Sequence, residues 1–144
     1  AQADRLVLPG DGHFVPPVMV RLDAVTDLKR EIFGPVLHVA TWKAGELDGL
    51  IDAINASGYG LTLGVHTRID SVAAHIAARA QVGNVYVNRN QIGAIVGSQP
   101  FGGRGLSGTG PKAGGPHYLF RFAEEKVIST DVTAAGGNAA LMAG

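Results

Sequence analysis

The chain has 144 residues, 46% of them hydrophobic, and its 12 basic and 12 acidic side chains give a formal net charge of zero. This length suits one modest domain with a buried core, and the absence of a basic stripe argues against nucleic-acid binding. Because the chain has no cysteine, disulfides, thiolate metal sites and a thiol nucleophile are excluded within these residues. We expect a reducing, cytoplasmic setting with no signal peptide and no transmembrane segment.

The first two thirds of the chain alternate between strand-like and helix-like patterns. Residues 1–17 are rich in turn-forming residues, and we expect them to be irregular. β-type apolar runs and apolar residues at helical spacing then follow one another. The expected elements are strands at 18–22 and 36–42, a helix at 46–57, a strand at 61–67, a helix at 70–81 and a strand at 84–88.

Each expected helix carries a recognisable terminus. The first has apolar residues on one face and Gly58 directly after it, where a left-handed glycine ends many helices. For the second helix, Asp70 and Ser71 are candidate N-caps, since their side-chain oxygens can accept a backbone N–H. The apolar face of the first helix consists of Leu47, Leu50, Ile51 and Ile54.

This order of elements predicts an α/β fold built from parallel βαβ units. In open α/β sheets, ligands bind beyond the carboxyl ends of the strands. The loop at 88–103 follows the last expected strand. The fold therefore favours this loop as a binding site.

The remainder of the chain is dominated by glycine. Residues 102–116 are rich in glycine and proline, and we expect no regular structure there. The segment 103–108 matches the dinucleotide pattern G-x-G-x-x-G, but the prolines after it prevent the helix which that pattern requires. Residues 124–132 alternate weakly like a strand and need another sheet edge, such as one from a second subunit. We divide the chain into a domain at 1–123 and a tail at 124–144.

Five residues are candidates for ligand contacts, and each has a structural alternative. The adjacent amides of Gly93 and Ala94 either belong to a surface turn or hold a carboxylate. Glu31 is either a solvated side chain or an acceptor of hydrogen bonds from two vicinal hydroxyls. Phe33 and Phe101 either fill the core or line a ligand. The five histidines of the chain show no metal-ligand spacing, so we expect no metal site.

Several motifs resemble a known family. Residues 31–35 resemble the E-[IV]-F-G-P motif of the aldehyde dehydrogenase superfamily, and 100–108 resembles its P-F-G-G-x-x-x-S-G segment. Segments 55–68, 83–90 and 93–97 are similar to 1-pyrroline-5-carboxylate dehydrogenases. The detail at 108–116 is similar to the bifunctional proline utilization A proteins. The resemblance extends over nearly the whole chain.

The resemblance implies the C-terminal part of a module that oxidises glutamate γ-semialdehyde to glutamate with NAD. Glu31 then matches the ligand of the nicotinamide ribose, and Phe33 matches a ring near the nicotinamide. Gly93 and Ala94 match the loop that holds the substrate α-carboxylate, and Phe101 matches an aromatic lining the aldehyde pocket. The family nucleophile is a cysteine, so no catalytic residue is expected in this chain.

The resemblance also implies partners. The nucleophile and the NAD-binding Rossmann domain would come from upstream segments, and FAD would be needed only if a proline dehydrogenase domain is present. The tail at 124–144 would be an oligomerisation strand in a homodimer or larger assembly. The absence of cysteine leaves an alternative, a non-catalytic structural or oligomerisation module of the same superfamily.

Overall fold

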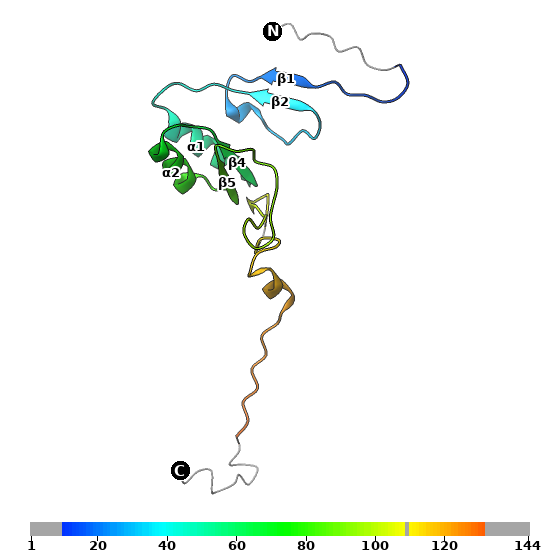
Figure 1. Cartoon of the computed structure of the whole chain (residues 1–144), viewed down its shortest axis with the longest axis vertical. Helices are drawn as coiled ribbons and strands as arrows, with labels where there is room; N and C mark the ends of the chain where they lie inside the picture. Colours follow the sequence, from blue (N-terminus) through cyan, green and yellow to red (C-terminus); the bar gives the residue numbers. More distant parts are fainter. Residues whose placement is uncertain (1–9, 109, 132–144) are drawn as a thin grey trace.

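The computed structural model describes residues 10–108 and 110–131 (Figure 1). Helices and short strands form its first part, and loops then lead into an extended C-terminal segment. The elements in chain order are β1 (Val18–Arg21), the 3-10 helix η1 (Val25–Asp27), β2 (Val36–Val39), α1 (Leu47–Ala56), β3 (Tyr59–Gly60), β4 (Thr62–Val65), α2 (Asp70–Arg79), β5 (Asn84–Val87), β6 (Arg104–Gly105) and the 3-10 helix η2 (Tyr118–Phe122).

The unit β4–α2–β5 is the centre of the fold. β4 and β5 pair in parallel, with Thr62 opposite Asn84 and Val65 opposite Val87. The helix α2 connects the two strands, as a parallel crossover requires. This arrangement confirms the α/β fold class and the second of the two expected βαβ units.

The first expected βαβ unit is not formed as a hydrogen-bonded pair. In the described part of the chain, the strands make three separate two-stranded sheets, and β2 pairs with β1 rather than with β4. The pairing of β1 with β2 is parallel, and it continues beyond both strands through the hydrogen bond from Leu22 N–H to the Val39 carbonyl at 2.8 Å. β1 thus satisfies one edge of β2, and no hydrogen bond joins the other edge to β4.

The helix α1 ends as its sequence predicts. Its apolar face buries Ile51, which is only 3% exposed. Gly58 has φ of +78° and donates its N–H to the Asn55 carbonyl at 3.1 Å. Because this left-handed conformation is strained for residues with a Cβ, glycine is the favoured residue at this terminus.

The helix α2 (Asp70–Arg79) begins at the expected residue, but its N-cap differs from the expected candidates. The N-cap position is Ile69, not Asp70 or Ser71, and no side chain caps it. The hydroxyl of Thr67 accepts the Ile69 N–H at 3.1 Å and fixes the approach to the helix. Asp70 therefore lies in the first turn, where a carboxylate interacts favourably with the positive end of the helix dipole.

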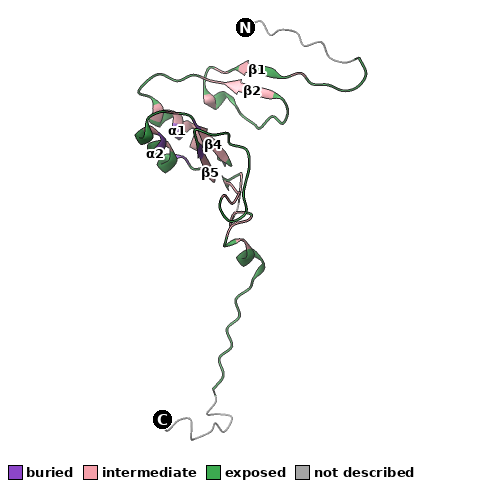
Figure 2. Cartoon of the chain, viewed as in Figure 1, coloured by how far each residue is buried: buried purple, intermediate pink, exposed green. Residues whose placement is uncertain are grey.

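Only a small core is buried, and it lies around α1 and the central unit (Figure 2). The chain exposes 11926 Å², whereas a compact protein of this mass exposes about 7,000 Å². Large apolar side chains such as Met19 and Phe120 are 71% and 69% exposed. These surfaces are ones that a partner or further chain would have to cover. The buried apolar residues among those described are Ile51, Val65, Ala73, Ala80 and Tyr86.

The glycine-rich second half contains more pairing than we expected. β6 pairs antiparallel with β3, so regular structure does occur within 102–116. The Gly102 carbonyl lies 1.7 Å from the position that a Cβ on Gly83 would occupy. The two distant segments can approach this closely because Gly83 has no Cβ. This proximity of backbones could not be inferred from local propensities.

The C-terminal segment leaves the rest of the fold after η2. Residues 123–131 are all exposed and form no strand in the described part of the tail (Figure 2). The remaining tail residues, 132–144, lie outside the described residues, as do 1–9 of the expected irregular lead-in. The boundary at 123/124 and the role of the tail in oligomerisation stay predictions. None of the helices in the described ranges is long and apolar enough to cross a membrane.

Candidate functional site

The candidate site begins where β5 ends. Asn88 has φ of +54°, a conformation that asparagine tolerates better than most residues. Its side chain accepts the Thr67 N–H at 3.0 Å and donates to the Thr67 carbonyl at 2.9 Å. These reciprocal bonds hold the carboxyl ends of β4 and β5 together. The loop at 88–103 therefore starts from a fixed point at the edge predicted for a ligand.

Gly93 and Ala94 present a free stretch of main chain. Both residues are exposed, and Gly93 has φ of +107°. Its carbonyl accepts a hydrogen bond from the Tyr86 hydroxyl at 2.9 Å. Among the hydrogen bonds of the described residues, none uses the N–H of Gly93 or of Ala94. Two adjacent free amides of this kind can bind an anion.

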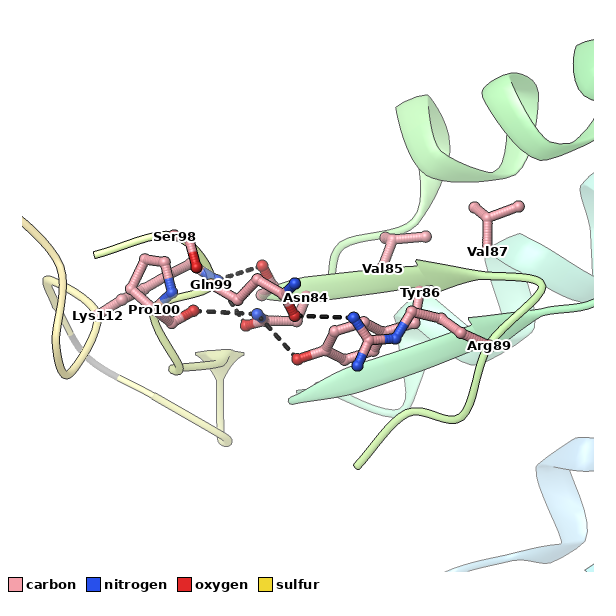
Figure 3. A pocket seen from close by; sticks show the side chains of 10 residues that line it. Asn84, Val85, Tyr86, Val87, Arg89, Ser98, Gln99, Pro100 and Lys112 are labelled. Carbon is pink, nitrogen blue, oxygen red and sulfur yellow. Dashed lines mark hydrogen bonds between the residues drawn. The ribbon is translucent and has the colours of Figure 1, made fainter. Parts of the chain in front are cut away.

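A polar cluster behind this loop connects β5 to distant segments (Figure 3). The Asn84 amide nitrogen donates to the Pro100 carbonyl at 3.0 Å and to the Tyr86 hydroxyl at 3.3 Å. The Lys112 ammonium donates to the Asn84 side-chain oxygen at 2.7 Å and to the carbonyls of Gly83 and Gly102. Partial burial without an anionic partner lowers the pKa of Lys112.

Arg89 connects the start of the same loop to its later part. Its guanidinium donates to the Gln99 side chain at 2.9 Å and lies 5.0 Å from the centre of the Tyr86 ring. A cation in this position is attracted to the face of the ring. These residues line a pocket, to which Val85 and Val87 also contribute, and Figure 3 shows the two valines pointing away from Tyr86 on the strand.

We did not predict Asn84, Tyr86 and Lys112 as site residues. The spacing of Asn84 and Tyr86 indicates that their side chains lie on the same face, since residues two apart on a strand share a face. Lys112 lies 28 residues beyond Asn84, and no local pattern indicates that the two meet.

Phe101 lies outside the polar cluster, near the end of the loop at 88–103. It forms an isolated antiparallel bridge with Ala113, in which each N–H donates to the other carbonyl at 3.0 and 2.8 Å. The residue is half-buried. Its side chain is thus held by main-chain pairing while part of its surface stays accessible.

Glu31 and Phe33 lie in the loop between η1 and β2. Glu31 is exposed, and Phe33 is 88% exposed, one of the most exposed large apolar side chains in the described ranges. No hydrogen bond, ion pair or ring contact of the described residues joins either side chain to Gly93, Ala94 or Phe101. The structure therefore presents the five predicted residues as two groups, and their convergence on one ligand stays a prediction.

The chain belongs to the aldehyde dehydrogenase family, whose model matches residues 3–128. The bifunctional protein PutA of Klebsiella aerogenes is 66% identical over 110 residues, which cover 76% of this chain and 8% of that protein. The 1-pyrroline-5-carboxylate dehydrogenase 1 of Halalkalibacterium halodurans is 43% identical over 132 residues, which cover 87% of this chain and 25% of that protein. The chain thus spans a small part of the length of these relatives.

Solved structures agree with this assignment. A crystal structure of PutA from Bradyrhizobium japonicum matches with a TM-score of 0.77 and 59% sequence identity, covering 81% of this chain and 12% of that one. A 1-pyrroline-5-carboxylate dehydrogenase from Thermus with bound NAD matches with a TM-score of 0.70 and 38% identity, covering 81% of this chain and 23% of that one. These matches confirm the expected family and fold.

Proposed function

We propose that this chain forms the C-terminal part of an NAD-dependent dehydrogenase that oxidises L-glutamate γ-semialdehyde to L-glutamate in proline catabolism. The observation that carries the proposal is the free amide pair of Gly93 and Ala94 beyond the end of β5. The relatives named PutA and 1-pyrroline-5-carboxylate dehydrogenase support this choice of substrate.

The amide pair suits the carboxylate end of this substrate. A carboxylate accepts hydrogen bonds from N–H donors, and bonds to a charged acceptor are the stronger kind. In this proposal the two amides hold the α-carboxylate, and Phe101 contacts the aliphatic stem that leads to the aldehyde. The substrate is then fixed at one end, so that its aldehyde carbon takes a defined position.

The loop between η1 and β2 suits the cofactor. Glu31 makes no hydrogen bond to another described residue, so its two oxygens are available to the hydroxyls of a ribose. The exposed ring of Phe33 offers a flat apolar surface for a nicotinamide. NAD, when bound, supplies the acceptor for the hydride that leaves the substrate carbon. The NAD-bound Thermus relative supports this cofactor.

The remaining parts of the active site would come from other segments. In the family, a cysteine thiol attacks the aldehyde, and this chain has no cysteine. We propose that upstream segments of the same polypeptide provide this nucleophile and the Rossmann domain. The tail at 124–144 would pair in a homodimer or larger assembly, and FAD would be present only with a proline dehydrogenase domain.

Turnover by the intact protein tests the proposal. We expect it to reduce NAD with glutamate semialdehyde as the substrate. Replacing Ala94 with leucine should raise the KM for the semialdehyde at least tenfold, because the larger side chain obstructs the carboxylate and weakens at least one of its hydrogen bonds to the amides. The KM for NAD should stay unchanged.

Gly93→Ala should act in the same direction, because φ of +107° is strained for alanine. Gly45→Ala is the matched control: Gly45 has φ of +92° and, like Gly93, open space around its Cβ position. It should leave both KM values unchanged. An intact protein without turnover would contradict the proposal and favour a non-catalytic structural module.

A further inference from the structure

The hydrogen bond from Tyr86 to Gly93 has a geometric consequence. The carbonyl that accepts this bond belongs to the same peptide group as the N–H of Ala94. No peptide bond in the described residues is cis, and in a planar trans peptide the C=O and N–H point in opposite directions. A hydroxyl that holds the Gly93 carbonyl therefore turns the Ala94 N–H away from β5, toward the exposed side of the loop.

The Tyr86 hydroxyl belongs to a series of hydrogen bonds in which only one donor-to-acceptor direction is possible. An ammonium group only donates hydrogen bonds, so the oxygen of the Asn84 amide must face Lys112. The amide nitrogen of Asn84 then faces Tyr86 and donates to its hydroxyl oxygen. The hydroxyl proton remains for the Gly93 carbonyl. Each bond in this series fixes the polarity of the next.

Burial makes this series rigid. Tyr86 is 5% exposed, and the Arg89 guanidinium lies over its ring. The phenol therefore cannot rotate away without disturbing the surrounding packing. Gly93, at the other end of the bond, is exposed and has the conformational freedom of glycine. The rigid partner thus determines the orientation of the flexible one.

We propose that Tyr86 is a positioning residue that aims the Ala94 amide at the carboxylate of the substrate, with Asn84 and Lys112 fixing the direction of its hydroxyl. This inference rests on the proposed function for the identity of the carboxylate. Without the hydroxyl, the Gly93–Ala94 peptide could rotate and present a carbonyl oxygen instead of an N–H. An oxygen there would repel the carboxylate that the amide attracts.

Tyr86→Phe in the intact protein tests the inference. The ring remains, and the Asn84 amide keeps the Pro100 carbonyl as an acceptor, so we expect the melting temperature to fall by no more than a few degrees. The KM for glutamate semialdehyde should rise roughly tenfold, as for one lost bond to a charged group. The KM for butanal, which has no carboxylate, and the KM for NAD should stay unchanged.

A second measurement determines the orientation of the Gly93–Ala94 peptide directly. Crystal structures of the wild type and of Tyr86→Phe should differ in the orientation of the Gly93–Ala94 peptide. Tyr59→Phe is the matched control, because the Tyr59 hydroxyl makes no hydrogen bond to another described residue. It should change neither the peptide orientation nor the KM values.

The outcomes separate this inference from the proposed function. An unchanged semialdehyde KM with an unchanged peptide orientation would overturn the role of Tyr86 and leave the function intact. An equal rise in KM for semialdehyde and butanal would indicate general loosening and would also overturn it. A wild-type protein that does not oxidise the semialdehyde would overturn the function, and the peptide orientation would then still decide whether Tyr86 positions the loop.

Discussion

The central unit β4–α2–β5 and the C-terminal segment after η2 differ strongly in how far their side chains are buried. The central unit contains most of the buried residues among those described, whereas residues 123–131 are all exposed (Figure 2). Val127 and Ile128 are 82% and 78% exposed. Burial of such side chains is the main source of stability. The comparison teaches that burial within this chain stabilises the central unit, whereas it contributes little to residues 123–131.

The largest expected effect is on the buried core that α1 shares with the central unit. Ile51→Ala should lower the local unfolding free energy of α1 by about 2–5 kcal/mol, because a buried isoleucine is replaced by a cavity. Hydrogen exchange of α1 peptides in the intact protein measures this quantity. Ile128→Ala in the tail is the control and should leave α1 exchange unchanged. Equal effects of the two substitutions would remove the distinction between the regions.

Next comes the contact between Gly83 and Gly102. Gly83→Ala places a Cβ 1.7 Å from the Gly102 carbonyl, so we expect a loss of about 1–3 kcal/mol from forced displacement of the backbone. Gly49→Ala has open space around the new Cβ and lies within α1. It should instead stabilise by up to about 1 kcal/mol. Hydrogen exchange of the β5 and α1 peptides distinguishes these opposite signs.

A smaller effect is expected for the tail, and it should appear in assembly rather than in folding. Ile128→Asp places a charge in a segment that we propose to pair with a second subunit. Cross-strand pairs each contribute about 0.2–1 kcal/mol, so the dissociation constant of the assembly should rise several-fold. Analytical ultracentrifugation over a concentration series measures it. An unchanged dissociation constant would argue against pairing of the tail.

The smallest effect concerns the contact between α1 and α2. A hydrogen bond from His75 at 2.5 Å, followed by the charge of Arg79, lowers the pKa of Asp48 below its ordinary value of 3.8. The resulting stabilisation is present above that value and is lost as the pH falls through the lower folded pKa. Asp48→Asn should therefore weaken α1 slightly at pH 7.

The difference between Asp48→Asn and the wild type should disappear in acid. Melting curves of the intact protein from pH 7 to pH 3 follow this convergence. The exposed Asp23→Asn serves as the control and should track the wild type throughout. A difference that persists or grows in acid would show that the His75 bond does not stabilise the helix contact.

Local patterns predicted the regular elements well. Helical spacing located Ile51 on the buried face, and Gly58 marked the end of α1, because both depend on residues close along the chain. The N-cap of α2 was predicted wrongly, since the position is Ile69 and the Thr67 hydroxyl organises the turn before the expected caps. Neighbouring residues compete for such a position, and sequence spacing does not rank them.

The candidate site was predicted only in part. Gly93 and Ala94 were chosen as candidates from their small size and their place after a strand, and their role stays a prediction. Tyr86 and Lys112 were missed because their roles depend on contacts across the fold: the Lys112 ammonium meets carbonyls of Gly83 and Gly102 that local patterns do not bring together. Whether Glu31 and Phe33 share a ligand with this loop depends in the same way on tertiary arrangement.

The two free N–H groups at Gly93 and Ala94 are main-chain donors, and they would remain if the neighbouring side chains were exchanged. Gln91, Ile92 and Val96 are all exposed, so they can vary without removing a donor. New side chains at these three positions should therefore change little in what we propose this loop to accept. Rerouting the backbone, by altering the glycine or the tyrosine that supports it, is the more effective means of changing selectivity.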